Sequence, residues 1–218
     1  RANGLDRVVI DPPAARFGIV STGKAYLDLR QALADLGLTE QTCAALGIRV
    51  YKVGMTWPLE VEGARRFAGG LADVLVVEEK HGFIEGQLVQ ALYNLPADQR
   101  PSVVGKSDER GAPLLPSEGE LNPTIVARAI VSRLERIGAG SAAMAQRVAR
   151  LESFEAVAAT PRIKSQRAPY FCSGCPHNSS TVVPEGSRAM AGIGCHAMAT
   201  WMPLRNTNLI THMGAEGT

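Results

Sequence analysis

Net charge, long apolar runs and cysteine are all scarce in this sequence of 218 residues. The net charge is only +2, which argues against a protein dedicated to nucleic acid, because such proteins concentrate positive charge. No uninterrupted apolar run approaches the roughly 18 residues that a membrane span requires. The sequence shows no basic segment followed by an apolar stretch, which is the pattern of a secretory signal. We therefore expect a cytoplasmic protein without a membrane or nucleic-acid partner.

The composition is that of a globular protein. Hydrophobic residues make up 45% of the chain, which excludes long disorder and a collagen-like fibre. The length suits one large domain or two small ones and allows a sizeable core. The sequence begins at Arg1 rather than at a methionine and stops within a glycine-rich segment, so we expect a piece of a longer protein.

Short apolar runs alternate with segments of helical periodicity over the first half of the chain. The pattern predicts buried strands at 17–21, 48–53, 74–77 and 102–104, and helices at 24–36, 40–46, 59–67 and 83–95. Strands that alternate with helices are typical of βαβ units. The predicted fold class is therefore α/β with a mainly parallel sheet.

The second half begins with a polar stretch rich in glycine and proline, at 105–119. Asn122 and Pro123 then have the N-cap and N1 pattern of a helix start, and Ser141 is suited to cap a further helix. Residues 160–169 contain three basic residues and two prolines, which is typical of a solvated linker. We expect a first domain at 1–119, a helical connection and linker at 120–169, and a second domain at 170–218.

Three of the four cysteines fall within a short segment near the end of the chain. Cys172 and Cys175 form a C-x-x-C pair, and Cys195 follows twenty residues later in the string GIGCH. This spacing fits an iron–sulfur cluster, a zinc ion or a redox disulfide, and buried thiols are a further alternative. For zinc, the fourth ligand would be His177 or His196, which could equally support the ligating residues or lie on the surface. The remaining cysteine, Cys43, lies in a predicted amphipathic helix and is interpreted as a packing residue.

The order of these motifs resembles a known family. The string YFCSGCPHNSSTVVPEGSRAMAGIGCHAMATWM is similar to the thiamine-diphosphate-binding domain of the 2-oxoacid:ferredoxin oxidoreductases, particularly of the fused, indolepyruvate type. The earlier strings GIVSTGKAYLDLRQAL, KVGMTWPLE and DVLVVEEKHGFIEGQL resemble the transketolase C-terminal-like domain that precedes it in that family. The resemblance thus covers most of the chain, in the family's order.

The resemblance implies an enzyme that decarboxylates a 2-oxoacid, such as an aryl pyruvate, on thiamine diphosphate. It implies transfer of the acyl group to coenzyme A and of electrons through iron–sulfur clusters to ferredoxin. The cluster ligands would be Cys172, Cys175 and Cys195, bound to a [4Fe–4S] cluster. The residues implied for thiamine diphosphate and Mg²⁺, with Glu216 as the metal ligand, are Gly194, Gly214, Glu216 and Gly217. Ala215 departs from the family, which usually has glycine there.

The resemblance also implies partners and limits. The other domains of the same enzyme would complete the site, and we expect a homo-oligomer. No catalytic residue is assigned within this chain, and we expect the chain alone to be inactive. Glu78 and Glu79, at the end of a predicted strand, are interpreted as interdomain contacts. The alternative function is a non-enzymatic α/β interaction module with a structural Cys₃His zinc site.

Overall fold

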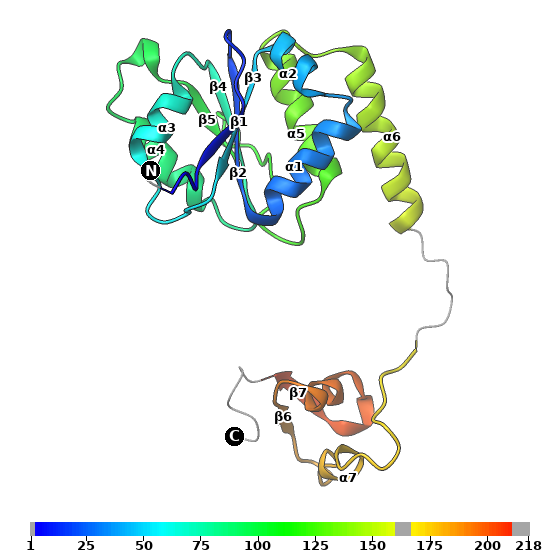
Figure 1. Cartoon of the computed structure of the whole chain (residues 1–218). Helices are drawn as coiled ribbons and strands as arrows, with labels where there is room; N and C mark the ends of the chain where they lie inside the picture. Colours follow the sequence, from blue (N-terminus) through cyan, green and yellow to red (C-terminus); the bar gives the residue numbers. More distant parts are fainter. Residues whose placement is uncertain (1–2, 160–166, 211–218) are drawn as a thin grey trace. The chain divides into compact units, whose positions relative to one another are not determined.

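The computed structural model describes residues 3–159 and 167–210 (Figure 1). The chain divides into two compact units, Arg1–Ala159 and Thr160–Thr218, each of which is described by itself. The first unit holds a five-stranded sheet with helices on both faces, and the second is small and mostly irregular.

The sheet of the first unit has the order β1-β3-β2-β4-β5. Its strands are β1 (Arg7–Ile10), β2 (Phe17–Thr22), β3 (Ile48–Val53), β4 (Asp73–Val77) and β5 (Ser102–Val104). The last four are parallel to one another, which confirms the predicted α/β class with a mainly parallel sheet. β1 was not predicted; it pairs antiparallel with β3 at the sheet edge, with an irregular register between Val8 and Ile10.

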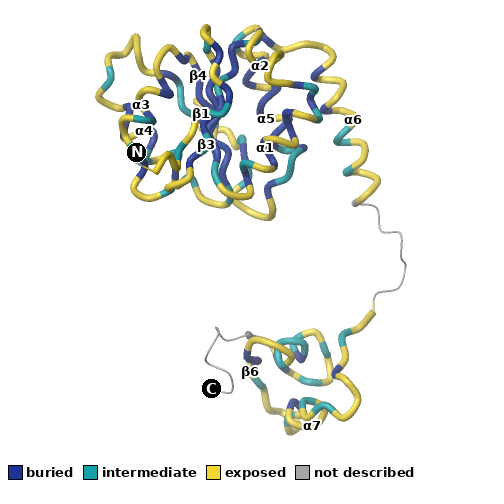
Figure 2. Tube along the Cα trace, viewed as in Figure 1, coloured by how far each residue is buried: buried dark blue, intermediate teal, exposed yellow. Residues whose placement is uncertain are grey.

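The two faces of the sheet carry separate hydrophobic cores, because successive strand residues point to opposite sides. Ile19, Leu75 and Val77 pack beneath one layer of helices. That layer consists of α1 (Gly23–Asp35), α2 (Glu40–Leu46), α5 (Pro123–Arg136) and α6 (Ala142–Ala159). Val20 and Val76 face the other layer, which consists of α3 (Val61–Ala68) and α4 (Phe83–Leu92); the short 3₁₀ turn η1 (Ala97–Gln99) follows α4 in the sequence. The central strands β2, β3 and β4 are accordingly among the most buried parts of this unit, whereas the edge strand β1 is partly exposed (Figure 2).

The predicted helix starts are present. The side chain of Ser141 accepts a hydrogen bond from the Met144 amide at the start of α6, at 3.3 Å. Asn122 accepts from the Ile125 amide at 2.9 Å, with Pro123 as the first residue of α5. These caps satisfy amides that have no partner within their own helix.

Helices α5 and α6, predicted as part of the connection at 120–169, pack within the first compact unit. Ile130 and Leu134 on α5 are fully buried, and α5 packs against α1. Its Arg133 guanidinium is buried too, and Nε donates to the Asp73 carboxylate at the start of β4, at 2.9 Å. The first unit therefore continues past residue 119, because α5 contributes buried side chains to the core that α1 and one face of the sheet share.

The second unit has little regular structure among residues 167–210. A single turn, α7 (His177–Ser180), is followed by β6 (Ala189–Ala191), the 3₁₀ segments η2 (Cys195–Trp201) and η3 (Pro203–Arg205), and β7 (Thr207–Ile210). Strands β6 and β7 pair parallel as a two-stranded sheet. Within the described part of the whole chain, no helix is both long enough and apolar enough to cross a membrane.

Candidate functional site

The Cys172–Cys175 pair lies on a tight turn. The Cys175 amide donates to the Cys172 carbonyl at 3.0 Å, and Gly174 between them has φ +76°, a conformation that favours glycine. The side-chain amide of Asn178 also donates to the Cys172 carbonyl, at 3.0 Å. The turn exposes the Cys172 side chain and leaves that of Cys175 half-buried.

Gly194, in the GIGCH string, immediately precedes Cys195. It has φ +97°, and η2 begins at the next residue. A Cβ added at Gly194 would meet no atom within 4 Å among the described residues, so the backbone angle, not lack of space, requires glycine. The conformation presents Cys195 as an exposed thiol.

Two histidine rings bring the two cysteine segments together. The His177 and His196 ring centroids are 6.1 Å apart. Nδ1 of His177 lies 3.3 Å from the Cys175 sulfur, whereas Nδ1 of His196 accepts a hydrogen bond from the Gly192 amide at 3.2 Å. His177 and His196, which are nineteen residues apart in the sequence, therefore share one small region of the second unit.

The side chains of this region are of the type that the predicted group needs, but among the described residues the structure does not bring three of them together. Cys172, Cys175 and Cys195 are free thiols, and thiolates are the ligands that iron–sulfur clusters use and that zinc also accepts. Within residues 3–159 and 167–210, no three His, Cys, Asp or Glu side chains are grouped closely enough to hold a metal ion. The remaining predicted cofactor residues, Gly214, Glu216 and Gly217, lie outside the described residues.

A second group of chemically active side chains lies where the parallel strands end, but these residues hold the fold together. Glu78 is buried, and its carboxylate accepts from the Ile84 and Glu85 amides at 2.8 and 3.0 Å. It therefore caps α4, and the interpretation of Glu78 as an interdomain contact is wrong. Lys24 forms ion pairs with Asp28, Glu79 and Glu120, and the hydrogen bond that its ammonium donates to the Glu120 carboxylate is the main reason that the pKa of this lysine is raised.

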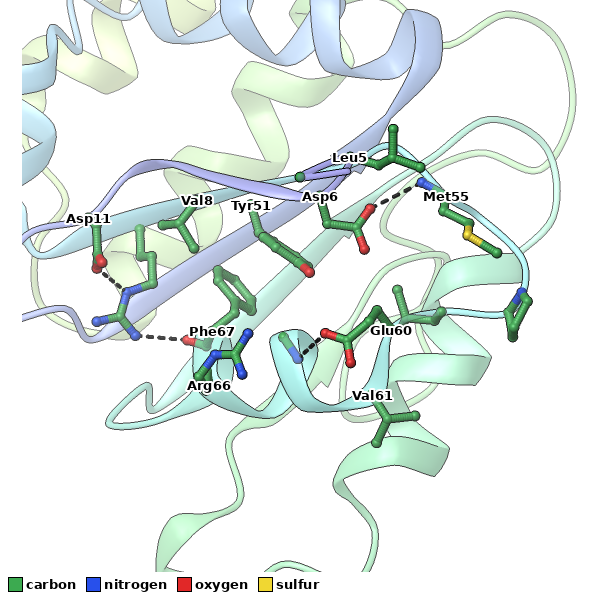
Figure 3. Close-up of a pocket in the computed structure, with 15 residues that line it drawn as sticks. Leu5, Asp6, Val8, Asp11, Tyr51, Met55, Glu60, Val61, Arg66 and Phe67 are labelled. Carbon is green, nitrogen blue, oxygen red and sulfur yellow. Dashed lines mark hydrogen bonds and ion pairs between the residues drawn. The ribbon is translucent and has the colours of Figure 1, made fainter. Parts of the chain in front are cut away.

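Sequence reasoning missed a cleft of about 730 Å³ between β1, β3 and α3 (Figure 3). Tyr51 and Phe67 stack in it with ring centroids 5.0 Å apart, and burial raises the pKa of Tyr51 to about 12. The Asp6 carboxylate accepts from the Gly54 and Met55 amides, which commits it to the chain itself. The lining comes from separate segments of the sequence, so no local pattern could have predicted the cleft.

The fold and the cysteine region together define an α/β protein with a thiol-rich appended unit, and the comparisons with known proteins narrow that class. The sequence profile of the indolepyruvate ferredoxin oxidoreductase middle domain matches residues 6–163. The chain therefore belongs to this family, and the matched range coincides closely with the first compact unit.

The similar proteins are consistent with that assignment. Indolepyruvate oxidoreductase subunit IorA of Thermococcus kodakarensis is 27% identical over 207 residues, covering 93% of this chain and 28% of that protein. The same subunit of Methanothermobacter marburgensis is 27% identical over 223 residues, covering 97% of this chain and 31% of that protein. The chain thus spans about a third of the length of these relatives.

Among solved structures, the 2-oxoglutarate:ferredoxin oxidoreductase of Magnetococcus marinus, with 2-oxoglutarate, coenzyme A and succinyl-CoA bound, aligns with a TM-score of 0.38 and 21% identity. That alignment covers 60% of this chain and 19% of that one.

Proposed function

We propose that this chain is part of a thiamine-diphosphate-dependent 2-oxoacid:ferredoxin oxidoreductase. The substrate is an aryl pyruvate such as indolepyruvate, the acyl group goes to coenzyme A, and the electrons go to ferredoxin. Membership of the indolepyruvate ferredoxin oxidoreductase family supports this proposal, and so do the names of the relatives. The family membership favours an enzyme over an interaction module with structural zinc.

The observation that carries the proposal is the contact between the two cysteine segments. Cys175 and Cys195 are far apart in the sequence, yet the neighbouring rings of His177 and His196 lie together. A ferredoxin-linked enzyme needs a one-electron relay, and a [4Fe–4S] cluster supplies that chemistry when bound. Cys172, Cys175 and Cys195 would hold it.

The chain's own residues prepare the thiols for this role. The turn at Gly174 sets the backbone between Cys172 and Cys175. The positive φ of Gly194 sets the backbone directly before Cys195. Cys172 and Cys195 are exposed, so their sulfurs are accessible to a metal. Gly194, Gly214, Glu216 and Gly217 would contribute to thiamine diphosphate and Mg²⁺, for which a carboxylate on a glycine-rich segment is a suitable hard ligand.

The test is Cys175→Ser in the full-length enzyme, prepared anaerobically. We expect loss of iron, loss of the visible thiolate-to-iron absorption and loss of ferredoxin reduction with an aryl pyruvate and coenzyme A. Cys43→Ala is the matched control, because Cys43 is buried in the first unit, and it should retain iron. Full iron and full turnover in Cys175→Ser would refute the proposal, and stoichiometric zinc in the native enzyme would favour the interaction module.

A further inference from the structure

The Cys175 sulfur has a side-chain neighbour of its own. His177 Nδ1 lies 3.3 Å from this sulfur, which is within hydrogen-bond range for a sulfur acceptor. The contact joins residues only two apart, on either side of Pro176, at the point where α7 begins. It therefore belongs to the same turn that presents the C-x-x-C pair.

Packing holds the His177 ring in this orientation. The ring stacks on Phe171 with centroids 5.3 Å apart and planes inclined by 23°. Phe171 is only 6% exposed, and the Arg205 guanidinium lies 5.9 Å from its ring centroid. The backbone is fixed as well, because the Thr181 hydroxyl donates to the His177 carbonyl at 2.6 Å. The imidazole thus belongs to a packed group.

The protonation of the contact follows from the chemistry of metal binding. A thiolate, and not a thiol, binds iron. A thiolate has no hydrogen to donate, so the contact with Cys175 persists in the loaded enzyme only when His177 carries its hydrogen on Nδ1. The neighbouring His196 has the opposite arrangement, since its Nδ1 accepts from the Gly192 amide.

We propose that His177 donates a hydrogen bond from Nδ1 to the ligating sulfur of Cys175 and thereby raises the reduction potential of the cluster held there. The inference rests on the proposed function, because it takes Cys175 as a cluster ligand. Hydrogen bonds to ligating sulfurs are one of the levers by which proteins set such potentials, since a donor favours the more negative, reduced state. His177 is a positioning residue in this account, because it acts through the sulfur.

The experiment is a redox titration of the full-length holoenzyme, monitored by electron paramagnetic resonance of the signal that Cys175→Ser removes. For His177→Ala we expect a more negative potential, equivalent to a fall of about threefold to tenfold in the ratio of reduced to oxidised cluster at fixed applied potential. His177→Asn should keep the potential close to the native value, because the asparagine Nδ2 can take the place of Nδ1. The hyperfine coupling of an exchangeable proton should also disappear in His177→Ala and persist in His177→Asn.

A matched control and a second variant keep the test decisive. His196→Asn preserves an acceptor for the Gly192 amide and should leave the potential unchanged. Phe171→Leu keeps the imidazole but removes its stacking partner, so it should give an intermediate shift. It carries the test, together with His177→Asn, if His177→Ala fails to retain the cluster.

The inference is overturned if the cluster of His177→Ala titrates at the native potential, if His177→Asn shifts as far as His177→Ala, or if His196→Asn shifts equally. Should His177→Ala lose the cluster, a native potential in Phe171→Leu overturns it. Full iron and full turnover in Cys175→Ser would instead refute the proposed function, so the two failures are distinguishable.

Discussion

At the scale of single residues, the four cysteines divide by exposure. Cys43 lies fully buried on α2, and burial raises the pKa of its thiol to about 11. A thiol with that pKa is ionised to only about one part in a thousand at pH 8, and the thiolate is the nucleophile. In the reduced, metal-free chain we therefore expect iodoacetamide to modify the exposed Cys172 and Cys195 while Cys43 stays unmodified, as measured by peptide mass spectrometry.

The pH dependence checks the cause. Because the pKa of Cys43 is raised, its thiolate becomes abundant only as the pH approaches 11, so labelling at pH 9 should still spare it. Labelling in urea at pH 8 should modify all four cysteines, because unfolding removes the burial. Rapid modification of Cys43 in the native chain at pH 8 would contradict the structure.

Some residue roles followed from sequence and others did not. The packing role of Cys43 is confirmed, because a cysteine on the apolar face of an amphipathic helix is usually buried. The role of Glu78 was missed, because the amides it accepts from belong to a helix that begins five residues later. A strand end followed by two acids does not reveal which acid turns inward.

At the scale of elements, the attachment of α4 to β4 depends on that acid. The Glu78 carboxylate accepts from two amides at the start of α4, and the Glu78 carbonyl accepts from the Lys106 ammonium at 2.7 Å. Glu78→Ala leaves buried amides without acceptors, so we expect a loss of about 1–3 kcal/mol in the free energy of unfolding, measured by urea denaturation.

Glu79→Ala is the matched control for the cap. The Glu79 side chain is partly exposed and 3.6 Å from Lys24, and solvent-exposed pairs of this kind contribute little to stability. Hydrogen exchange should accelerate in the first turn of α4 for Glu78→Ala only. Equal stabilities of the two variants would show that Glu78 does not hold the helix start.

Elements with strong periodicity were predictable and the edge strand was not. Strands β2 and β4 are short, mainly apolar runs that are largely buried, β3 alternates in part, and Thr39 marks the start of α2. β1 has four residues, two of them exposed, and it becomes a strand only because β3 lies beside it. That pairing spans about forty residues of sequence, so a local pattern could not reveal it.

At the scale of the whole molecule, the spacing of the cysteines indicated where the candidate site lies, but not how it is built. The C-x-x-C pair and the GIGCH string identified Cys172, Cys175 and Cys195 as candidates for a metal. The stacking of His177 on Phe171 and its proximity to His196 depend on how three segments of the second unit pack. Such contacts depend on tertiary structure. The sequence alone therefore left open whether the histidines support the ligating residues or lie on the surface.

The extent of the first unit gives the last prediction. On α5, the side chains of Val126, Ile130 and Leu134 are fully buried in the core that α1 shares. Burying three such side chains is worth on the order of 5–9 kcal/mol, which is comparable with the whole stability of an ordinary domain. In urea, a chain of residues 1–159 should therefore unfold cooperatively, at the same midpoint as the first unit does within residues 1–218. A chain of residues 1–119 should show no cooperative transition by circular dichroism. Should residues 1–119 unfold at that same midpoint, α5 would have to be an accessory to the first unit, and a domain ending at 119 would stand.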